Sequence, residues 1–367
     1  MYSLTELSQK EQAYQKPSEV GAFSLDSDRR FHNDRRQMSY YVNPNPPLGK
    51  RFLNLSDGYG TNRYIKRDEK NGADLSPMLE WIVANKLRFS KDSSNKLRLP
   101  KIVTWRGNLT KIMITPYERY DDWMFAAQKF NGVVYINNIE TERLLDKRKN
   151  TTERQEEMCY WGHKFEKYVT KPCDMKSFSN EQMQNSTVNT HEGYVSVVSS
   201  KFGKDLSIII GAEVDCAIDH QNFKPPNSYI ELKTNRHFKN NYQEKNFWQF
   251  KALKWWSQSF LNGIPSIVCG FRDDNGYVDY IQEFKTLQIP SIAKNYHQPW
   301  SGTKCVNFVG NILNKVIDIL EEVEENDTIC LFKWDFKSDF IEFKIDKNSE
   351  HAFLPEWFMN SMLNENS

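Results

Sequence analysis

Long apolar stretches are missing from this sequence of 367 residues, in which no run approaches the roughly 18 to 20 residues that a membrane-spanning helix needs. The first residues, MYSLTELSQKEQ, lack the basic start and the apolar centre of a secretory signal. The six cysteines form no CxxC pair and have no histidine partner nearby, which argues against a zinc knot or a disulfide framework. We therefore expect an intracellular protein with reduced thiols and no membrane association.

A strong excess of charge of either sign is also missing. The chain has 49 Lys and Arg residues against 48 Asp and Glu residues, which gives a net charge of +1. The overall basic excess of many nucleic-acid-binding proteins is therefore absent, although a local basic groove is compatible with this balance. Aromatic residues make up 14% of the chain, and the mean hydropathy is −0.72. These values predict a soluble globular protein with ample aromatic side chains for a core or for stacking on bases.

The organisation of the chain predicts one domain. No internal repeat and no Gly/Ser linker divides it, so residues 1–367 are expected to fold as a single compact unit. Strand-rich runs interrupted by single helices predict a mixed α/β fold, α+β-like, with largely antiparallel and mixed β-sheets flanked by helices. We expect an irregular N-terminal wrap over 1–72, a motif-bearing core over 100–285, and a C-terminal helix and hairpin over 286–367.

Local patterns predict the individual elements. Runs rich in β-branched and aromatic residues predict strands over 101–105, 109–115, 123–130, 133–139, 194–200, 206–218, 229–234, 266–271, 277–284, 328–334 and 340–346. Apolar residues at helical spacing predict helices over 76–87, 153–169, 244–262 and 303–325. Asn131-Gly132 and Asp274-Asn275-Gly276 predict hairpin turns, and polar residues predict a loop over 171–191.

The helix over 153–169 carries two features of interest. Met158, Trp161, Phe165 and Tyr168 are spaced to form one apolar stripe, which predicts the buried face. Gly162 lies in the interior of the helix, where glycine costs about 1 kcal/mol relative to alanine. Such a glycine needs a reason, and we expect another backbone to approach it closely.

Four polar residues stand on two predicted strands. In the run GAEVDC, Glu213 and Asp215 share the face opposite the apolar residues, because side chains alternate along a strand. In the run IELK, Glu231 and Lys233 likewise share one face. If the two strands pair, three carboxylates and one amine converge on one patch.

This patch has two interpretations that the pattern alone leaves open. Crowded carboxylates repel one another, and a hard divalent cation such as Mg²⁺ removes that cost because it prefers carboxylate oxygens. The lysine would then hold a nucleophilic water or a phosphate oxygen. Alternatively, the two strands form an amphipathic edge hairpin whose outer face is solvated.

Basic residues elsewhere suggest contacts to phosphate. On the helix over 244–262, Lys251, Lys254 and Gln258 follow helical spacing and share a face that could meet phosphate oxygens or solvent. Arg106 follows the strand over 101–105 and could grip a phosphate as a bidentate fork. The run LDKRKN over 145–150 is a weak candidate for a nuclear import signal, and a solvated loop is the alternative.

At these residues the sequence resembles the DXO/Rai family of RNA 5′-end decapping enzymes, whose core is similar to that of PD-(D/E)xK nucleases. The matching runs occur in a consistent order, and together they cover residues 100–285. They are TWRG (104–107), GHKFE (162–166), GAEVDC (211–216), IELK (230–233), WWSQSFLNGIP (255–265) and GFRDDNGYV (270–278). His163 stands where this motif is expected to have an aromatic residue.

The resemblance implies a hydrolase that uses one or two Mg²⁺ or Mn²⁺ ions at RNA 5′ ends. It would release pyrophosphate from triphosphate ends, or remove unmethylated, NAD or FAD caps, and 5′→3′ exoribonuclease activity could follow. The implied metal ligands are Glu166, Glu213, Asp215, Glu231 and the carbonyl of Leu232. The implied catalytic residues are Glu213, Lys233 and Gln258. The implied substrate-binding residues are Arg106, Lys233, Gln258 and Lys254.

The resemblance leaves alternatives for the biological role. The chain could stabilise or activate a nuclear 5′→3′ exoribonuclease with little catalysis of its own, as in the Rai branch. A DNA endonuclease with the same metal motif is a third hypothesis, which the order of the motifs disfavours. We expect single-stranded RNA 5′ ends as the ligand and a nuclear location, with the cytoplasm as the alternative.

Overall fold

Two large β-sheets form the framework of the protein. The computed structural model describes residues 1–44, 53–68, 74–86, 100–175, 182, 185–218, 222–296, 299–323, 328–346 and 350–363. Parts of several predicted segments lie outside these residues, namely 45–52 and 69–72 of the N-terminal wrap, 176–181 and 183–184 of the predicted loop, and the ends of two predicted helices at 87 and 324–325. Within the described part, no helix has the length and apolarity to cross a bilayer.

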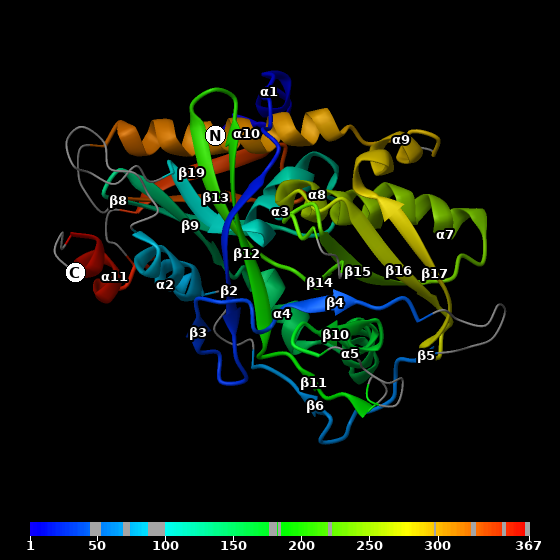
Figure 1. Ribbon diagram of the computed structural model, residues 1–367. Helices are drawn as coiled ribbons and strands as arrows, with labels where there is room; N and C mark the ends of the chain where they lie inside the picture. The colour runs from blue at the N-terminus through cyan, green and yellow to red at the C-terminus, as the bar shows by residue number, and fades with distance from the viewer. Residues whose placement is uncertain are drawn as a thin grey trace.

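The larger sheet has ten strands, most of them antiparallel (Figure 1). In spatial order these are β1 (Tyr2–Ser3), β19 (Phe340–Asp346), β18 (Ile329–Trp334), β8 (Trp123–Phe130), β9 (Val133–Ile139), β7 (Ile102–Trp105), β13 (Leu206–Glu213), β12 (Gly193–Phe202), β2 (Ser18–Leu25) and β3 (Phe31–His32). β7 runs parallel to both of its neighbours, which makes the sheet mixed. The turn between β8 and β9 has positive φ angles at Asn131 and Gly132, which confirms the predicted hairpin.

The second sheet has seven strands and is also mixed. Its spatial order is β10 (Thr170–Pro172), β4 (Ser39–Tyr41), β14 (Cys216–Ala217), β15 (Tyr229–Arg236), β16 (Ser266–Arg272), β17 (Tyr277–Lys285) and β5 (Leu53–Asn54). A separate parallel pair is formed by β6 (Tyr64–Ile65) and β11 (Val188–Asn189).

Helices cover both faces of each sheet. They are α1 (Leu4–Gln9), α2 (Ser76–Ala84), α3 (Arg106–Ile114), η2 (Thr115–Tyr117), α4 (Glu142–Lys149), α5 (Glu153–Tyr168), α7 (Asn241–Asn246), η3 (Phe247–Lys251), α8 (Ala252–Asn262), η4 (Thr286–Gln288), α9 (Ile289–Ala293), α10 (Gly302–Glu321) and α11 (Glu356–Leu363). In Figure 1, α10 lies across the top of the molecule, and α2 and α11 lie together on the left.

Side chains alternate along each strand, so one strand contributes to two different hydrophobic cores on its two faces. On β16, Ile267 and Cys269 belong to the largest core, which α3, α8 and α10 fill between the sheets, whereas Val268 packs with α5 on the opposite face. On β13, Ile208 faces the same central core and Ile209 faces α2 and α11. The protein is therefore layered as helices, sheet, helices, sheet and helix, which confirms the predicted fold class.

Several predicted elements were wrong. The N-terminal segment is not irregular, because its strand β2 pairs with β12 over most of its length inside the ten-stranded sheet. Residues 109–115 were predicted as a strand, but 106–114 form helix α3, whose residues Leu109, Ile112 and Met113 bury one helical face. The predicted strand over 206–218 is two strands in different sheets. Residues 145–149 belong to helix α4 and not to a loop.

Smaller differences concern two helices and a loop. The predicted helix over 244–262 consists of α7, a π-helical turn and α8. On α5, Trp161, Phe165 and Tyr168 are buried as predicted, but Met158 is exposed. Short strands β10 and β11 lie in the predicted loop over 171–191, and α11 was not predicted.

The interior glycine of α5 does not have the predicted close neighbour. A Cβ atom added at Gly162 would meet no atom within 4 Å. The tight contact occurs at Gly270 on β16, where an added Cβ would lie 2.5 Å from Cε2 of Phe165. The ring that packs against Gly270 therefore belongs to Phe165, the residue before Glu166 on α5.

These two glycines give opposite predictions for stability. We expect Gly270→Ala to lower the free energy of unfolding by about 1–3 kcal/mol, because the methyl group overpacks a closed contact. Gly162→Ala should raise it by about 0.5–1 kcal/mol, because alanine restricts the unfolded chain and finds open space in the helix. Chemical denaturation of both variants beside the wild type measures the difference. Equal stability of the two variants would contradict the packing described for Phe165.

Candidate active site

The candidate site lies where the chain crosses from one sheet to the other. β13 ends at Glu213 in the ten-stranded sheet, and β14 begins at Cys216 in the seven-stranded sheet. The N–H of Val214 donates to the carbonyl oxygen of Tyr194 at 2.9 Å and fixes the crossing. Glu213 and Asp215 therefore lie at the ends of two different strands and not on one strand face.

β15 brings the second pair of polar residues to this crossing. Cys216 pairs with Ile230, so the IELK run lies directly beside Asp215. The N–H of Leu232 donates to Oδ2 of Asp215 at 2.6 Å. The two segments thus pair, which is the condition under which the sequence predicted that their carboxylates converge.

Glu231 is held between two cations. Its side chain is 2% exposed, Oε2 lies 3.0 Å from Nη1 of Arg106, and Oε1 lies 2.5 Å from Nζ of Lys233. Burial opposes ionisation of Glu231, but the charges of Arg106 and Lys233 outweigh it and lower its pKa to about 2. Burial also opposes the charge of Lys233, yet Glu231 and Asp215 raise its pKa. Both groups are therefore charged at neutral pH.

The remaining carboxylates repel one another. Burial raises the pKa of Asp215 well above its usual range, and the charges of Glu231 and Glu166 add to this. Glu213 faces an open cavity. Its pKa is nevertheless raised, because the surrounding protein reduces the hydration of its carboxylate and the charge of Glu166 repels it. On α5, Nδ1 of His163 lies 3.7 Å from Oε2 of Glu166, and this contact raises the pKa of His163 to about 9. The cluster thus has more negative charge than its own basic groups balance.

A cavity of about 390 Å³ opens beside these carboxylates, and we call it the acidic cavity. Glu166, Glu213 and Asp215 line one side of it. Residues of β6 and β11 and of the end of α4 also line it. The other lining residues include Tyr64, Lys66, Arg67, Arg148, Glu156, Cys159, His163, Lys167 and Tyr194. The cavity therefore mixes charges of both signs with two tyrosine rings.

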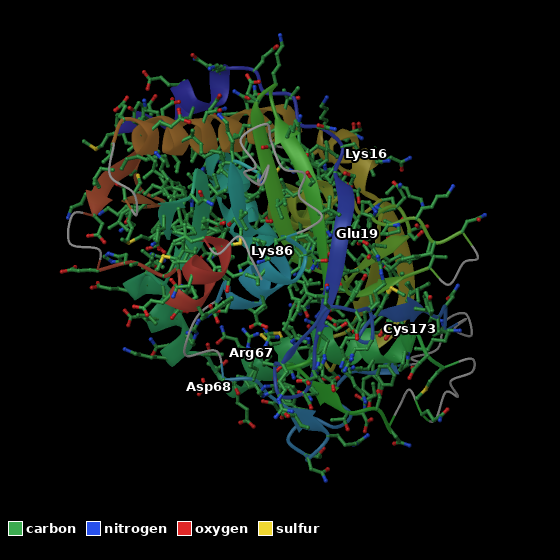
Figure 2. All side chains as sticks on the ribbon, turned by 60° about the vertical axis from the view of Figure 1, so that its left-hand side comes forward. Lys16, Glu19, Arg67, Asp68, Lys86 and Cys173 are labelled. Atoms are coloured by element: carbon green, nitrogen blue, oxygen red, sulfur yellow. The ribbon has the colours of Figure 1, made fainter. Side chains whose placement is uncertain are left out.

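A polar network that is buried except for the partly exposed Arg35 supports this region. Arg35 Nη1 donates to the hydroxyl of Tyr194 at 2.8 Å, and Arg35 Nη2 donates to Glu19 Oε1 at 2.5 Å. Glu19 also accepts hydrogen bonds from Ser196 and Tyr229. Glu19 lies near the start of β2 (Figure 2), so this N-terminal strand is tied both to β12, which carries Tyr194, and to the start of β15.

The predicted phosphate-binding residues of α8 lie on another side of the cluster. Gln258 and Lys254 line a second cavity of about 220 Å³, together with Gly107 and Lys111 of α3. We call this the lysine cavity. Lys251 does not line it; its Nζ donates to Oδ1 of Asn235 at 3.0 Å. Lys251 and Lys254 line an adjoining hollow, so the three residues follow one another along the same side of the helix, as predicted.

Direct contacts join the two cavities. Asp215 lines the acidic cavity and accepts from Leu232, the adjacent Glu231 pairs with Arg106, and Gly107 lines the lysine cavity. Arg106 was predicted to grip phosphate, and its guanidinium is occupied by Glu231 in the structure. The predicted residues thus form one continuous site with a hollow at each end.

Sequence reasoning missed several residues of this site. Tyr194 and Lys111 line the two cavities, but each lies in an apolar run and was read as structural. Lys147 and Arg148 belong to the basic run considered as an import signal, and they line the lysine and the acidic cavity respectively. The dense positive charge of that run was the available signal, since a groove for phosphate needs such residues.

The donor chemistry fits a hard divalent cation. The side chains of Glu166, Glu213, Asp215 and Glu231 and the carbonyl of Leu232 offer only oxygen, which Mg²⁺ and Mn²⁺ accept. Burial raises the pKa values of Glu213 and Asp215, and the charges of neighbouring carboxylates raise them further; a cation would offset that repulsion. Among the described residues, however, no three acidic, histidine or cysteine side chains are gathered closely enough to hold a metal as they stand. Binding therefore requires these side chains to draw together.

Comparison with known proteins places this site in a family. A family model described as RAI1-like PD-(D/E)XK nuclease matches residues 15–359. The decapping and exoribonuclease protein of Xenopus laevis is 36% identical over 95% of this chain and 86% of its own length, and the human protein is 35% identical with the same coverage. The decapping nuclease RAI1 of Neurospora crassa is 32% identical over 96% of this chain and 84% of its own length.

Solved structures give the same result. The crystal structure of Candida albicans Rai1 in complex with pU5 and Mn²⁺ is similar with a TM-score of 0.83, at 26% identity and with 96% of each chain covered. That of Scheffersomyces stipitis Rai1 in complex with 3′-NADP⁺ and a calcium ion has a TM-score of 0.84, at 25% identity, over 99% of this chain and 100% of that one. The family and the fold predicted from the motifs are confirmed by these matches. The protein described here belongs to the RAI1-like PD-(D/E)XK nucleases.

Proposed function

We propose that this protein is a divalent-metal-dependent hydrolase that acts on the 5′ end of RNA. The observation that carries the proposal is the buried Glu231, which joins the carboxylates of the acidic cavity to Arg106 and Lys233. Relatives of nearly the same length are decapping and exoribonuclease proteins, and the Candida albicans neighbour binds pU5 with Mn²⁺. A nuclease of this family with intact carboxylates and an intact lysine supports hydrolysis over a purely structural role.

Glu166, Glu213, Asp215, Glu231 and the carbonyl of Leu232 would hold one or two Mg²⁺ or Mn²⁺ ions. A bound ion would lower the pKa of an attacking water and stabilise the charge that develops on the phosphate. Glu213 is exposed to the open cavity, so it suits the role of orienting that water. Lys233 is 22% exposed, charged, and fixed at the end of a buried ion pair.

Arg106 and Gln258 would bind the phosphate that is cleaved. Arg106 presents a fork of N–H donors that matches phosphate oxygens, and it needs only to exchange one anionic partner for another. Gln258 lines the lysine cavity from α8 and makes no hydrogen bond with the described part of the chain. A phosphate held between these two side chains would lie next to Lys233 on β15.

The acidic cavity would accept the group that leaves from the 5′ end. Its volume of about 390 Å³ and its mixed polar lining suit a pyrophosphate or a nucleotide cap. Structures of neighbouring Rai1 proteins contain 3′-NADP⁺ and 3′-FADP, which supports NAD-type and FAD-type caps as substrates besides triphosphate and unmethylated ends. An association with a nuclear 5′→3′ exoribonuclease and a nuclear location stay predictions, which co-purification and imaging of the tagged protein would test.

Removal of divalent cations should abolish hydrolysis. Without a counter-ion, the repelling carboxylates cannot be drawn together, so we expect no product from 5′-triphosphate RNA in EDTA. Mg²⁺ or Mn²⁺ added in excess should restore the reaction, as measured by release of pyrophosphate. Undiminished turnover in EDTA would contradict the metal site.

Glu231→Gln should lose activity and stability together. Removing one charge from a buried ion pair leaves Lys233 and Arg106 without their anion, which costs about 3–5 kcal/mol. We also expect turnover to fall at least about 100-fold, because removing one charged group from a pre-organised active site typically has an effect of that size. Denaturation and a pyrophosphate assay measure the two effects, with Glu283→Gln on β17 as an exposed control. Normal turnover by Glu231→Gln would remove Glu231 from the site.

Recognition should begin at the RNA terminus. The described site offers charged groups for phosphate and no side-chain array for reading bases, so a free 5′ end is the feature that it can distinguish. We expect linear 5′-triphosphate RNA to be hydrolysed and a circular RNA of the same sequence to stay intact under the same conditions. Gel analysis of both substrates checks this, and equal cleavage of the two would show an endonuclease.

A further inference from the structure

We propose that Lys164 is a positioning residue that determines which 5′ groups the acidic cavity holds. It acts through residues 53–67, which we call the strap and which supply Tyr64, Lys66 and Arg67 to the lining of that cavity. Lys164 itself does not line the cavity. The inference rests on the proposed function, because it concerns the selectivity of that same site.

Helix α5 carries the carboxylate cluster and the strap on different sides. Cys159, His163 and Glu166 line the acidic cavity from this helix. Lys164 stands two residues before Glu166, so its side chain leaves the helix in a direction roughly 200° away, and it is completely buried. Its charged end lies next to Asp57 of the strap. The same helix therefore connects the cluster to the strap through Glu166 and Lys164.

Two tyrosines of α5 hold the strap against the helix. The hydroxyl of Tyr168 donates to the carbonyl oxygen of Asn54 at 2.8 Å, and the hydroxyl of Tyr160 donates to the carbonyl oxygen of Asp57 at 2.6 Å. The ring of Tyr160 also packs edge-on against the ring of Tyr64, with 4.8 Å between the ring centroids. One side chain of α5 thus contacts both the middle of the strap and the part that reaches the cavity.

A chain of charges runs through this contact. Nζ of Lys164 lies 3.4 Å from Oδ2 of Asp57 and 4.8 Å from the centre of the Tyr168 ring. Asp57 also accepts from Arg63, with Nη1 at 3.0 Å from Oδ2 and Nη2 at 2.7 Å from Oδ1. Arg63 directly precedes Tyr64 in the strap. Asp57 therefore links the helix to the end of the strap that lines the cavity.

Folding stability does not explain the lysine. A buried ammonium is costly, and burial lowers the pKa of Lys164 although the charge of Asp57 opposes this. Without Lys164, Asp57 keeps both contacts with Arg63 and is 32% exposed, so no unpaired carboxylate would be buried. An apolar contact tolerates small shifts of the strap, whereas a buried ammonium has to stay beside its carboxylate. What Lys164 contributes is therefore a fixed position of the strap.

The far end of the strap is joined to other parts of the cavity lining. Nζ of Lys66 lies 2.7 Å from Oε1 of Glu156 on α5, and the N–H of Arg67 donates to Oγ1 of Thr190 at 2.7 Å. All four residues line the acidic cavity. An NAD-type cap is larger than a pyrophosphate and would contact more of this lining, so its binding depends more on the position of the strap.

Two variants remove the contact from its opposite ends, and a third is the control. Lys164→Met keeps the length and the apolar stem of the side chain, and Asp57→Asn removes the charge on the strap. Lys129→Met makes the same exchange at a half-buried lysine of β8, which donates to the carbonyl oxygen of Leu320 at 3.1 Å and does not line the cavity. KM and kcat are measured on RNAs of one sequence that begin with a triphosphate or with an NAD cap. Amide hydrogen exchange over residues 53–67 is measured without RNA.

We expect a selective effect on the larger 5′ group. Lys164→Met and Asp57→Asn should raise KM for NAD-capped RNA about tenfold, because a loosely held strap has to be ordered on binding. KM for triphosphate RNA and kcat for both RNAs should change by less than about twofold, as for a lost binding contact. Exchange over the strap should be about tenfold faster in both variants. Lys129→Met should match the wild type in every measurement.

Three results would overturn the role of Lys164. These are an equal rise of KM on both RNAs, a fall of kcat on triphosphate RNA, and unchanged exchange over the strap. If Lys164→Met does not fold, Asp57→Asn carries the same expectations. Wild-type protein that hydrolyses neither RNA would contradict the proposed function instead. Exchange over the strap and anisotropy of both labelled RNAs in Ca²⁺ would then decide whether Lys164 affects the binding of the larger 5′ group.

Discussion

The ion pairs of Glu231 with Arg106 and Lys233 are the interaction on which the site depends. A carboxylate that is 2% exposed is costly unless cations compensate it, and here the cations come from two different elements. Arg106 is the first residue of α3, which packs in the core between the sheets, and Lys233 is on β15 of the seven-stranded sheet. The pairs thus hold α3 against β15 and fix the position of the groups that would meet phosphate. Because each cation is already charged and oriented, a phosphate can replace the carboxylate as its partner with little rearrangement.

The crossing between the sheets explains why the carboxylates meet at all. Glu213 completes a strand in one sheet, and Asp215 precedes a strand in the other, so two residues that are neighbours in sequence are held by separate frameworks. The network of Glu19, Arg35 and Tyr229 ties the N-terminal strand β2 to β15 behind this crossing. The N-terminal segment is therefore part of the support of the site, even though it contains none of the predicted site residues.

The sequence predicts those features that local patterns determine. Asn131-Gly132, the strand pair of β16 and β17, and most of α5, α8 and α10 followed from turn residues and helical spacing. α3 was predicted as a strand because LTKIMIT is rich in β-branched residues, and only packing in the core between the sheets selects the helix. The break at Val214 could not be predicted either, since nothing in an alternating run shows that its two halves join different sheets. The convergence of Asp215 with Glu231 was predicted, whereas the partner of Arg106 requires the tertiary structure.

Charge balance gives the strongest link between this structure and a cation. The cluster gathers four carboxylates, of Glu166, Glu213, Asp215 and Glu231, against the two permanent cations Arg106 and Lys233. The excess of negative charge adds to the effect of burial in raising the pKa of Asp215, and it helps to raise that of His163 to about 9, so it favours the protonated forms of both groups. An RNA 5′ end brings further negative charge to the same place, and protons alone cannot offset it while the carboxylates are needed as ligands. A divalent ion offsets both the carboxylates and the phosphate, so the electrostatics of the metal-free site already imply that substrate and metal are bound together.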